Sequence, residues 1–562
     1  MSTNPLGDVE PPDQGLCAGN GYVAEANNIG EVMVFNTALN RMSRAIPLDT
    51  LMGLTQKGWS SGGDPSCLYD ASNGGHFFFT EIVSESSEAN GGAFSGCFIS
   101  AAPSDCLEGV AVSAGNNPFG PYNVYFVNAN YNPNEAGYPN LFNDYAKIAT
   151  TRDAFLLFYD EFPNLPNTDP GFGAGGFFNG AQELAFSKTA LELGEPVTLA
   201  NGRPNPDFNV AVENMGELGT PDGTCAAVGA CWYQVIPAAA PDPTQFDNSA
   251  GGTGFMVGSL DFFGSGDTRM AVFDWTGLSA LDNKNCKACS GVRFGGQLFS
   301  GGPFYYGEGQ LGAQKAGPIP LGVECGAVAP NPPTLANCPE GGIATNGDGA
   351  TQASQADGQI WFAVSTEVNQ TFASESAPET HQGAVYWVVG THGFNPNGTG
   401  LALTSSGYVS AAHEDIEFAT MAAEGQPWQD GGNGGAIMSF TVNGVGGPTG
   451  ADNGGFYPSS AFGRLTATSG NLLGSINIAD LGRSPQDGFT EYQGLPGPTR
   501  PRWGDYGNAI FVPGTGGRIY FASEYIQYPN CTGAAFTLTK PTCGGTRDDD
   551  ANWGTSVNYV RP

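Results

Sequence analysis

The most regular pattern of hydrophobic and polar positions is a pair of short apolar runs separated by a Gly-rich turn. At 507–512 the sequence GNAIFV predicts a strand, PGTGG at 513–517 predicts a turn, and RIYFASEYI at 518–526 predicts a second, aromatic strand. The same order recurs in GYVAEANNIGEVMVFN at 21–36 and in DPSCLYDASNGGHFFFTEI at 64–82. Much of the chain therefore consists of a repeated unit, in which a polar segment is followed by a strand, a turn and an aromatic strand.

This unit recurs about seven times, at irregular intervals of roughly 60–90 residues. Amphipathic helical periodicity is almost absent. We therefore expect an all-β fold, a β-propeller of about seven blades with long inserted loops stapled by disulfides. Six or eight blades, or a pair of β-sandwiches, remain open, whereas the lack of a short fixed repeat argues against a β-helix. The expected boundaries are an approach segment at 1–19, the propeller at 20–528 and a tail containing Cys and Asp at 529–562.

Composition fits many short strands and excludes several kinds of partner. The 562 residues include 85 Gly and 40 Pro, which suit many turns, while an aromatic content of 11% argues against disorder. The 54 acidic and 20 basic residues give a net charge of −34, which excludes a nucleic-acid-binding surface. No apolar run reaches the length of a membrane span, so we expect no membrane span.

The 12 cysteines are even in number and mostly near neighbours. Disulfides are the favoured interpretation, and they imply an oxidising, extracellular compartment and a secreted protein. Cys17 and Cys67 would tie the first two units together. Cys286 and Cys289 form a C-x-x-C without a nearby His, so zinc is not favoured. The remaining cysteines could each form a disulfide with a near neighbour, although spacing does not determine the connectivity. These pairs are Cys97 with Cys106, Cys225 with Cys231, Cys325 with Cys338, and Cys531 with Cys543.

Several stretches carry a resemblance to a known family. They include PPDQGLCAGNGYVAEANN at 11–28, YAKIATTRDAF at 145–155, LDFFGSGDTRMAVF at 260–273 and PRWGDYGNAIF at 501–511. In these pieces the chain resembles a large family of secreted bacterial propeller-like proteins that share the WGDY sequence. The resemblance implies secretion and a propeller, and it supplies no activity to carry over to particular residues.

Carboxylates recur where the units begin. Converging on one channel mouth, they would hold a hard cation such as calcium or raise one another's pKa for acid–base catalysis. The plainer alternative is that each one caps a turn or accepts backbone N–H groups. The candidate metal ligands are Asp64, Asp144, Asp348 and Asp505, and the candidate catalytic groups are Asp153, Asp415 and Asp505.

Candidate ligand-binding residues are cations and aromatic side chains in polar loops. Arg152, Arg502 and Tyr506 offer the residue types of a sialidase site, although the sialidase turn repeat is incomplete. Trp428, in a Gln- and Gly-rich loop, suits stacking on a sugar ring. We expect a secreted propeller that binds a carbohydrate or an extracellular surface partner. The alternatives are a glycan-cleaving enzyme and a structural subunit of an extracellular assembly, and a homo-oligomer is left open.

Overall fold

The computed structural model describes most strands of the chain and the turns between them. Its described residues are 2–3, 13–84, 106–129, 141–163, 180–200, 202–215, 231–261, 267–283, 291–304, 312–315, 343, 349–371, 377–394, 400–424, 435–446, 455–466, 472–486, 503–513, 517–527 and 552–561. Among these residues no helix is both long enough and apolar enough to cross a membrane.

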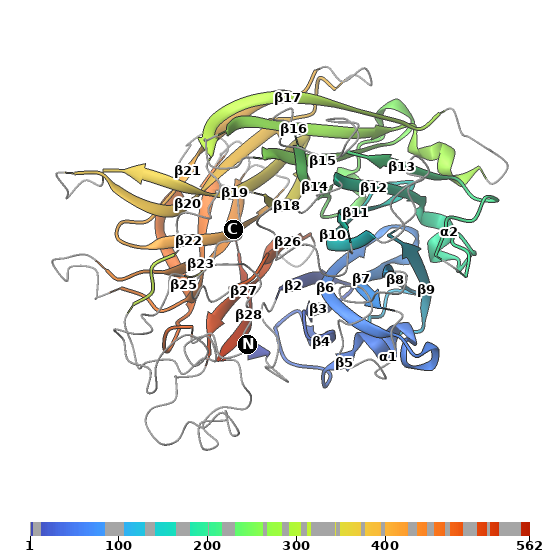
Figure 1. Cartoon of the computed structure of the whole chain (residues 1–562), viewed down its shortest axis with the longest axis horizontal. Coiled ribbons are helices and arrows are strands. Elements are labelled where there is room, and N and C mark those ends of the chain that lie inside the picture. The colour runs from blue at the N-terminus through green and yellow to red at the C-terminus, as the bar shows by residue number, and fades with distance from the viewer. Residues whose placement is uncertain are drawn as a thin grey trace.

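The described strands form a ring of seven four-stranded blades (Figure 1). Blade 1 contains β2 (Gln14–Gly19), β3 (Tyr22–Asn27), β4 (Glu31–Asn36) and β5 (Ile46–Pro47). Blade 2 contains β6 (Ser60–Asp70), β7 (His76–Ser84), β8 (Cys106–Ser113) and β9 (Tyr122–Asn128). Blade 3 contains β10 (Leu141–Thr150), β11 (Ala154–Pro163), β12 (Gly180–Ser187) and β13 (Val210–Asn214).

The second half of the ring repeats this order. Blade 4 contains β14 (Cys231–Ala239), β15 (Thr253–Asp261), β16 (Asp267–Thr276) and β17 (Arg293–Phe304). Blade 5 contains β18 (Ala350–Ala356), β19 (Gln359–Gln370), β20 (Glu379–Gly390) and β21 (Ala402–Val409). Blade 6 contains β22 (Asp415–Ala423), β23 (Gly435–Asn443), β24 (Ser459–Thr466) and β25 (Leu472–Asp480). The inner strands β14 and β18 pair in parallel and join blades 4 and 5 into one sheet.

Blade 7 closes the ring with strands from both ends of the chain. It contains β26 (Asn508–Val512), β27 (Arg518–Ile526) and β28 (Trp553–Val560), and β1 (Ser2–Thr3) pairs with β28 at its outer edge. Figure 1 shows the N-terminus beside β28, where the first and last colours of the chain meet. The expectation of about seven blades is therefore confirmed.

The helices are short and lie between strands. They are α1 (Leu48–Met52), α2 (Lys188–Glu192), and the 3-10 helices η1 (Thr55–Lys57), η2 (Ser72–Gly74), η5 (Pro243–Gln245), η6 (Ser249–Gly251) and η7 (Leu278–Asp282). Among the described strands, two-residue turns connect β2 to β3 and β18 to β19. In the turn between β2 and β3, Asn20 and Gly21 both have positive φ, 47° and 89°. This is the backbone that a tight hairpin requires, and Asn-Gly adopts it readily.

Both faces of a blade are buried, which explains the continuous apolar runs. In β7, Phe77 and Phe79 pack in the core between blades 1 and 2. Phe78, which points the other way, packs in the core between blades 2 and 3 together with Phe155. Because successive side chains of a strand point to opposite faces, a run such as His-Phe-Phe-Phe supplies two cores at once.

The structure differs from the expected boundaries at both ends. Residues 14–19, assigned to an approach segment, form β2, the inner strand of blade 1. Part of the expected tail forms β28, which pairs along its length with β27. The physical reason is ring closure, because a propeller without β28 would leave an inner strand pair with an open edge.

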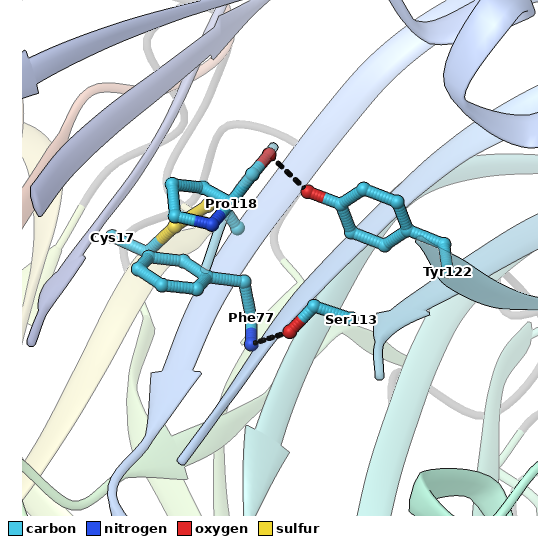
Figure 2. Close-up of a disulfide and its surroundings, with 6 residues drawn as sticks. Cys17, Phe77, Ser113, Pro118 and Tyr122 are labelled. Carbon is cyan, nitrogen blue, oxygen red and sulfur yellow. Dashed lines mark hydrogen bonds between the residues drawn. A yellow bond between two sulfur atoms is a disulfide. The ribbon is translucent and has the colours of Figure 1, made fainter. Parts of the chain in front are cut away.

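The disulfide Cys17–Cys67 joins the inner strands of blades 1 and 2, as the sequence predicts, with a Cα–Cα distance of 5.2 Å. Figure 2 shows its surroundings, where the N–H of Phe77 donates to the Ser113 hydroxyl over 2.7 Å. The Tyr122 hydroxyl donates to the carbonyl oxygen of Pro118. Of the other predicted pairs, Cys106 is described and Cys97 lies outside the described residues. Cys225, Cys286, Cys289, Cys325, Cys338, Cys531 and Cys543 also lie outside them.

Replacing both cysteines by serine is expected to lower the free energy of unfolding by about 4 kcal/mol, because the bridge closes a loop with a sequence separation of 50. Denaturation of the double variant measures this loss. Wild-type protein treated with reductant should match the variant. A variant as stable as the oxidised protein would contradict the prediction.

Candidate functional site at the axis of the ring

The inner strands are bulged near the face where they begin, which we call the upper face. The register shifts in β6 between Gly63 and Ser66, and comparable shifts occur in β10, β14, β18 and β22. Asp64 in β6 and Tyr145 in β10 have φ values of 54° and 62°. A positive φ is uncommon outside glycine, and a bulge redirects the side chain it carries. The bulges therefore turn side chains of the inner strands toward the axis of the ring.

Three of these side chains are carboxylates from three different blades. Asp13 directly precedes β2, Asp64 lies in the bulge of β6, and Asp505 lies three residues before β26. All three are buried, and one oxygen atom of each lies within 4.8 Å of the others. We call them the Asp triad. Two unit charges at this separation repel by about 3 kcal/mol at an effective dielectric constant of 20. Ionised together, the carboxylates need a compensating charge.

Backbone N–H groups hold the Asp triad in place. Oδ1 of Asp13 accepts the N–H of Asp505 at 2.5 Å and that of Tyr506 at 3.3 Å. Its Oδ2 accepts the side-chain amide of Asn28 at 2.9 Å. Oδ2 of Asp64 accepts the N–H of Tyr145 at 3.0 Å. The carboxylates thus link neighbouring blades as well as facing one another.

A buried lysine and two tyrosines surround the triad. Nζ of Lys147 lies 2.8 Å from the ring centre of Tyr506 and 4.2 Å from that of Tyr145. Within the described part of the chain this nitrogen has no hydrogen-bond partner. Burial lowers the pKa of Lys147 to about 7, although the charges of Asp64, Asp13 and Asp505 act to raise it. Lys147 is therefore only a partial counter-charge for the triad.

Glu524 adds a fourth buried carboxylate beside the triad. Burial, followed by the charge of Asp13, raises the pKa of Glu524 well above its usual value. Its Oε1 accepts the side-chain amide of Gln14 at 3.1 Å, and its Oε2 has no partner among the described residues. A Cβ atom at Gly504 would lie 2.3 Å from Oε1, and Gly504 has a φ of 149°. The glycine of the WGDY sequence therefore leaves the space that the Glu524 carboxylate occupies.

The structure brings together some of the candidate residues at this axis. Asp64, Asp505 and Tyr506 lie in or beside the Asp triad. Asp144 is half-buried at the start of the β10 bulge, and its charge acts on Lys147. Sequence reasoning missed Asp13, although a signal exists: Asp13 precedes Cys17 much as Asp64 precedes Cys67 in the next blade.

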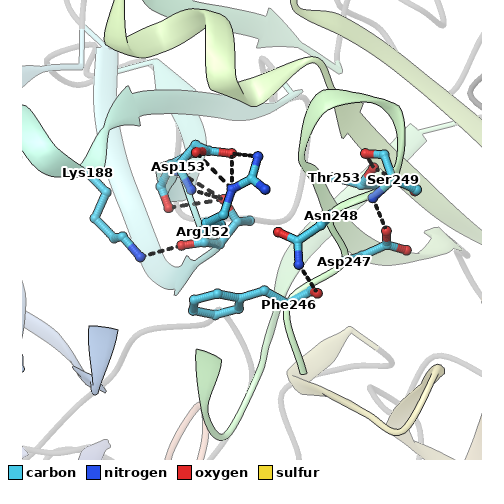
Figure 3. A network of polar contacts seen from close by, with 10 residues as sticks. Arg152, Asp153, Lys188, Phe246, Asp247, Asn248, Ser249 and Thr253 are labelled. Atoms are coloured by element: carbon cyan, nitrogen blue, oxygen red, sulfur yellow. Dashed lines mark hydrogen bonds and ion pairs between the residues drawn. The ribbon is translucent and has the colours of Figure 1, made fainter. Parts of the chain in front are cut away.

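Arg152 and Asp153 lie at the opposite face of the ring. Asp153 was expected where a unit begins, but both residues occupy the turn after β10, where the chain reverses into β11. The Arg152 guanidinium pairs with the Asp153 carboxylate at 2.9 Å (Figure 3). Neither residue contributes to the Asp triad, because β10 begins at the upper face and ends at the lower face, where the two residues lie.

Asp415, the first residue of β22, acts on the backbone. Its Oδ1 accepts the N–H of Gln382 at 2.7 Å and its Oδ2 accepts the N–H of Ala313 at 2.6 Å. Burial raises its pKa. These bonds match the plainer expectation of a carboxylate that anchors backbone N–H groups. Arg502, Trp428 and Asp348 lie outside the described residues.

A second buried charged group lies at the lower face, where the inner strands end. Nζ of Lys188 donates to Oδ2 of Asp70 at 2.7 Å, and both side chains are fully buried. The same nitrogen donates to the Ser72 hydroxyl and to the carbonyl oxygen of Thr151, as Figure 3 shows in part. The Phe246 ring centre lies 4.8 Å from it. This lysine is saturated by contacts from blades 2, 3 and 4, which assigns it to the architecture.

No protein-family model and no curated protein matches the sequence. Among solved structures, a sialidase of Trypanosoma rangeli in complex with 2,3-difluorosialic acid is 9% identical, with a TM-score of 0.33, over 96% of this chain and 59% of the sialidase. The endo-1,5-alpha-L-arabinanase of Thermotoga petrophila is 10% identical, with a TM-score of 0.27, over 83% of this chain and 98% of the arabinanase.

Drosophila Semaphorin 2a is 10% identical, with a TM-score of 0.29, over 76% of this chain and 61% of the semaphorin. The chain thus spans about three fifths of the length of the sialidase and of the semaphorin. Likenesses this distant say nothing about the activity of the chain, which has to be argued from its own residues.

Proposed function

We propose that the protein is an extracellular binding protein whose upper face takes a carbohydrate or a surface partner in a cation-dependent way. The observation that carries the proposal is the Asp triad, three buried carboxylates with oxygens within 4.8 Å of one another. Hard oxygen ligands without His or Cys suit calcium, which accepts irregular coordination by carboxylates, carbonyls and water. Binding of calcium would replace the repulsion within the triad by attraction.

The triad favours binding over glycan cleavage because substrate can hardly reach it. Asp13 is fully buried, and Asp64 and Asp505 are 7% and 6% exposed. A general acid or nucleophile has to come within hydrogen-bond distance of the glycosidic bond. The carboxylates are better placed to bind an ion that shapes the surface above them. Secretion is part of the proposal and is supported by the disulfide between blades 1 and 2.

The test combines calcium titration with a search for the ligand. Calorimetry on the full chain should show calcium binding, and Asp64→Asn should weaken it at least about tenfold, since it removes one charged ligand. Asp274→Asn is the matched control, because Asp274 is a buried carboxylate in β16 outside the triad. Retention on polysaccharides or a glycan array should be lost when a chelator is added.

Other outcomes favour the rival functions. Release of glycan products that Asp505→Asn abolishes, with the fold intact, would replace the binding proposal by a glycan-cleaving enzyme. No retention and no products, together with a large particle in light scattering, would favour a structural subunit of an extracellular assembly. No calcium binding would remove the cation from the proposal.

A further inference from the structure

The Asp triad lies where the two ends of the polypeptide meet. Asp505 approaches blade 7, Asp13 approaches blade 1 and Asp64 belongs to blade 2. Asp13 and Asp505 are separated by 492 residues, and the hydrogen bond between them crosses from the last blade to the first. In Figure 1 the inner strands β26, β2 and β6 follow one another around the axis. The triad therefore spans the boundary between blades 7 and 1, which we call the closing boundary.

The closing boundary differs from the other boundaries between blades in how it is held. Elsewhere the chain runs directly from one blade into the next, and Cys17–Cys67 adds a covalent link between blades 1 and 2. At the closing boundary, the chain passes from β1 in blade 7 to β2 in blade 1, and β1 is attached to β28 through only two residues. Apolar packing of Leu16 and Val23 against Tyr520 completes the contact. Within the described ranges, the contacts between the strands of blades 7 and 1 are noncovalent.

The polar part of the closing boundary gathers carboxyl groups from both blades. Asp13 lies on the blade 1 side, and Glu524 in β27 lies on the blade 7 side, where its Oε1 accepts the side-chain amide of Gln14 in β2 at 3.1 Å. Glu524 is 4% exposed, and its Oε2 lacks a partner among the described residues while its carboxylate lies against Gly504, next to Asp505. A buried acceptor without a donor is rare and suggests a missing partner. A bound cation would supply that partner. It would also replace the repulsion within the Asp triad by attraction.

We infer that a divalent cation at the Asp triad acts as a clasp that closes the ring between blades 7 and 1. Without the cation, repulsion among Asp13, Asp64 and Asp505 loosens the closing boundary and the upper face above it. With the cation, the first and last blades are held by shared ligands. This inference rests on the proposed cation site and adds that the cation controls ring closure, whatever partner the upper face binds.

Hydrogen–deuterium exchange of the full-length wild-type protein, with calcium chloride or with a chelator, tests the clasp without any partner. We expect calcium to slow exchange at least about tenfold in β2, β26 and β28, which flank the closing boundary. The reference is β15, a strand of blade 4 whose exchange should change much less. Asp64→Asn should abolish the calcium effect at the closing boundary, and Asp274→Asn should preserve it.

The outcomes separate the clasp from the proposed function. Calcium binding in calorimetry with equal protection of all blades, or with none, would overturn the clasp and leave the cation site standing. Protection confined to the closing boundary, without retention on any glycan or surface, would support the clasp and refute the proposed binding role. Absence of calcium binding would overturn both the cation site and the clasp.

Discussion

In the presence of a chelator, the free energy of unfolding is expected to fall by several kcal/mol between pH 5 and pH 7.5. Burial raises the pKa well above the usual value in six buried carboxyl groups, Glu81, Glu108, Asp160, Glu183, Glu417 and Glu524. In Asp274 it raises the pKa to about 6. Each pKa unit corresponds to about 1.4 kcal/mol for one group.

The sign follows from proton counts. Between the ordinary carboxyl pKa and the raised values, the folded protein keeps protons that the unfolded chain has released. Stability therefore decreases as the pH rises through this window. Lys147 acts in the opposite direction above pH 7, because its lowered pKa makes the unfolded chain bind the additional proton. The steepest loss is expected below pH 7.

Denaturant unfolding at a series of pH values measures this effect. Glu183→Gln is the informative variant, because both Glu183 oxygens lack partners among the described residues. It should flatten the pH dependence by up to about 1.4 kcal/mol per pH unit. A wild-type protein whose stability is constant or rises over this range would show that these carboxyl groups titrate normally.

Replacing Lys188 by methionine is expected to destabilise the ring by about 3–5 kcal/mol. The change leaves the Asp70 carboxylate as an unpaired charge in a fully buried position. The Thr151 carbonyl oxygen and the Ser72 hydroxyl each lose the same donor. Thermal or denaturant unfolding measures the loss.

Two further variants sharpen this test. Adding Asp70→Asn to Lys188→Met should restore part of the stability, because the uncharged amide oxygen can still accept the N–H of Ser72. Arg152→Met is the matched control, since Arg152 belongs to an ion pair at the surface of the same face, with the guanidinium side 49% exposed. It should cost less than about 1 kcal/mol. Equal losses for Lys188→Met and Arg152→Met would contradict the argument from burial.

The strands were largely predictable because their signals are local. Apolar runs rich in aromatic and β-branched residues, separated by Gly-containing turns, correctly indicated β27 at Arg518–Ile526 and the hairpin of β3 and β4. The count of about seven units followed from their recurrence. The outer strands were harder, because β13 (Val210–Asn214) is short and carries little apolar signal of its own.

The axis was predictable only in part. Asp64 and Asp505 were found because each opens a unit, whereas Asp13 was missed because ring closure places a segment near the N-terminus at the centre. Arg152 and Asp153 were expected at the wrong face, because the aromatic strand that they precede is the second one of its blade. No sequence pattern announced the approach of Glu524 to Gly504, which arises from bulge geometry in three dimensions.

The pairing of β1 with β28, and of blade 1 with blade 7, has a consequence for the order of synthesis. A ribosome makes blade 1 first, yet the apolar side chains of Leu16, Val23 and Phe35 find their partners Tyr520 and Val557 only when the last strand has emerged. Until then one side of blade 1 stays exposed to solvent. The nascent chain therefore exposes an aggregation-prone apolar surface for nearly the whole of its translation. A chaperone that binds β2 and β3 would cover this surface until blade 7 is made.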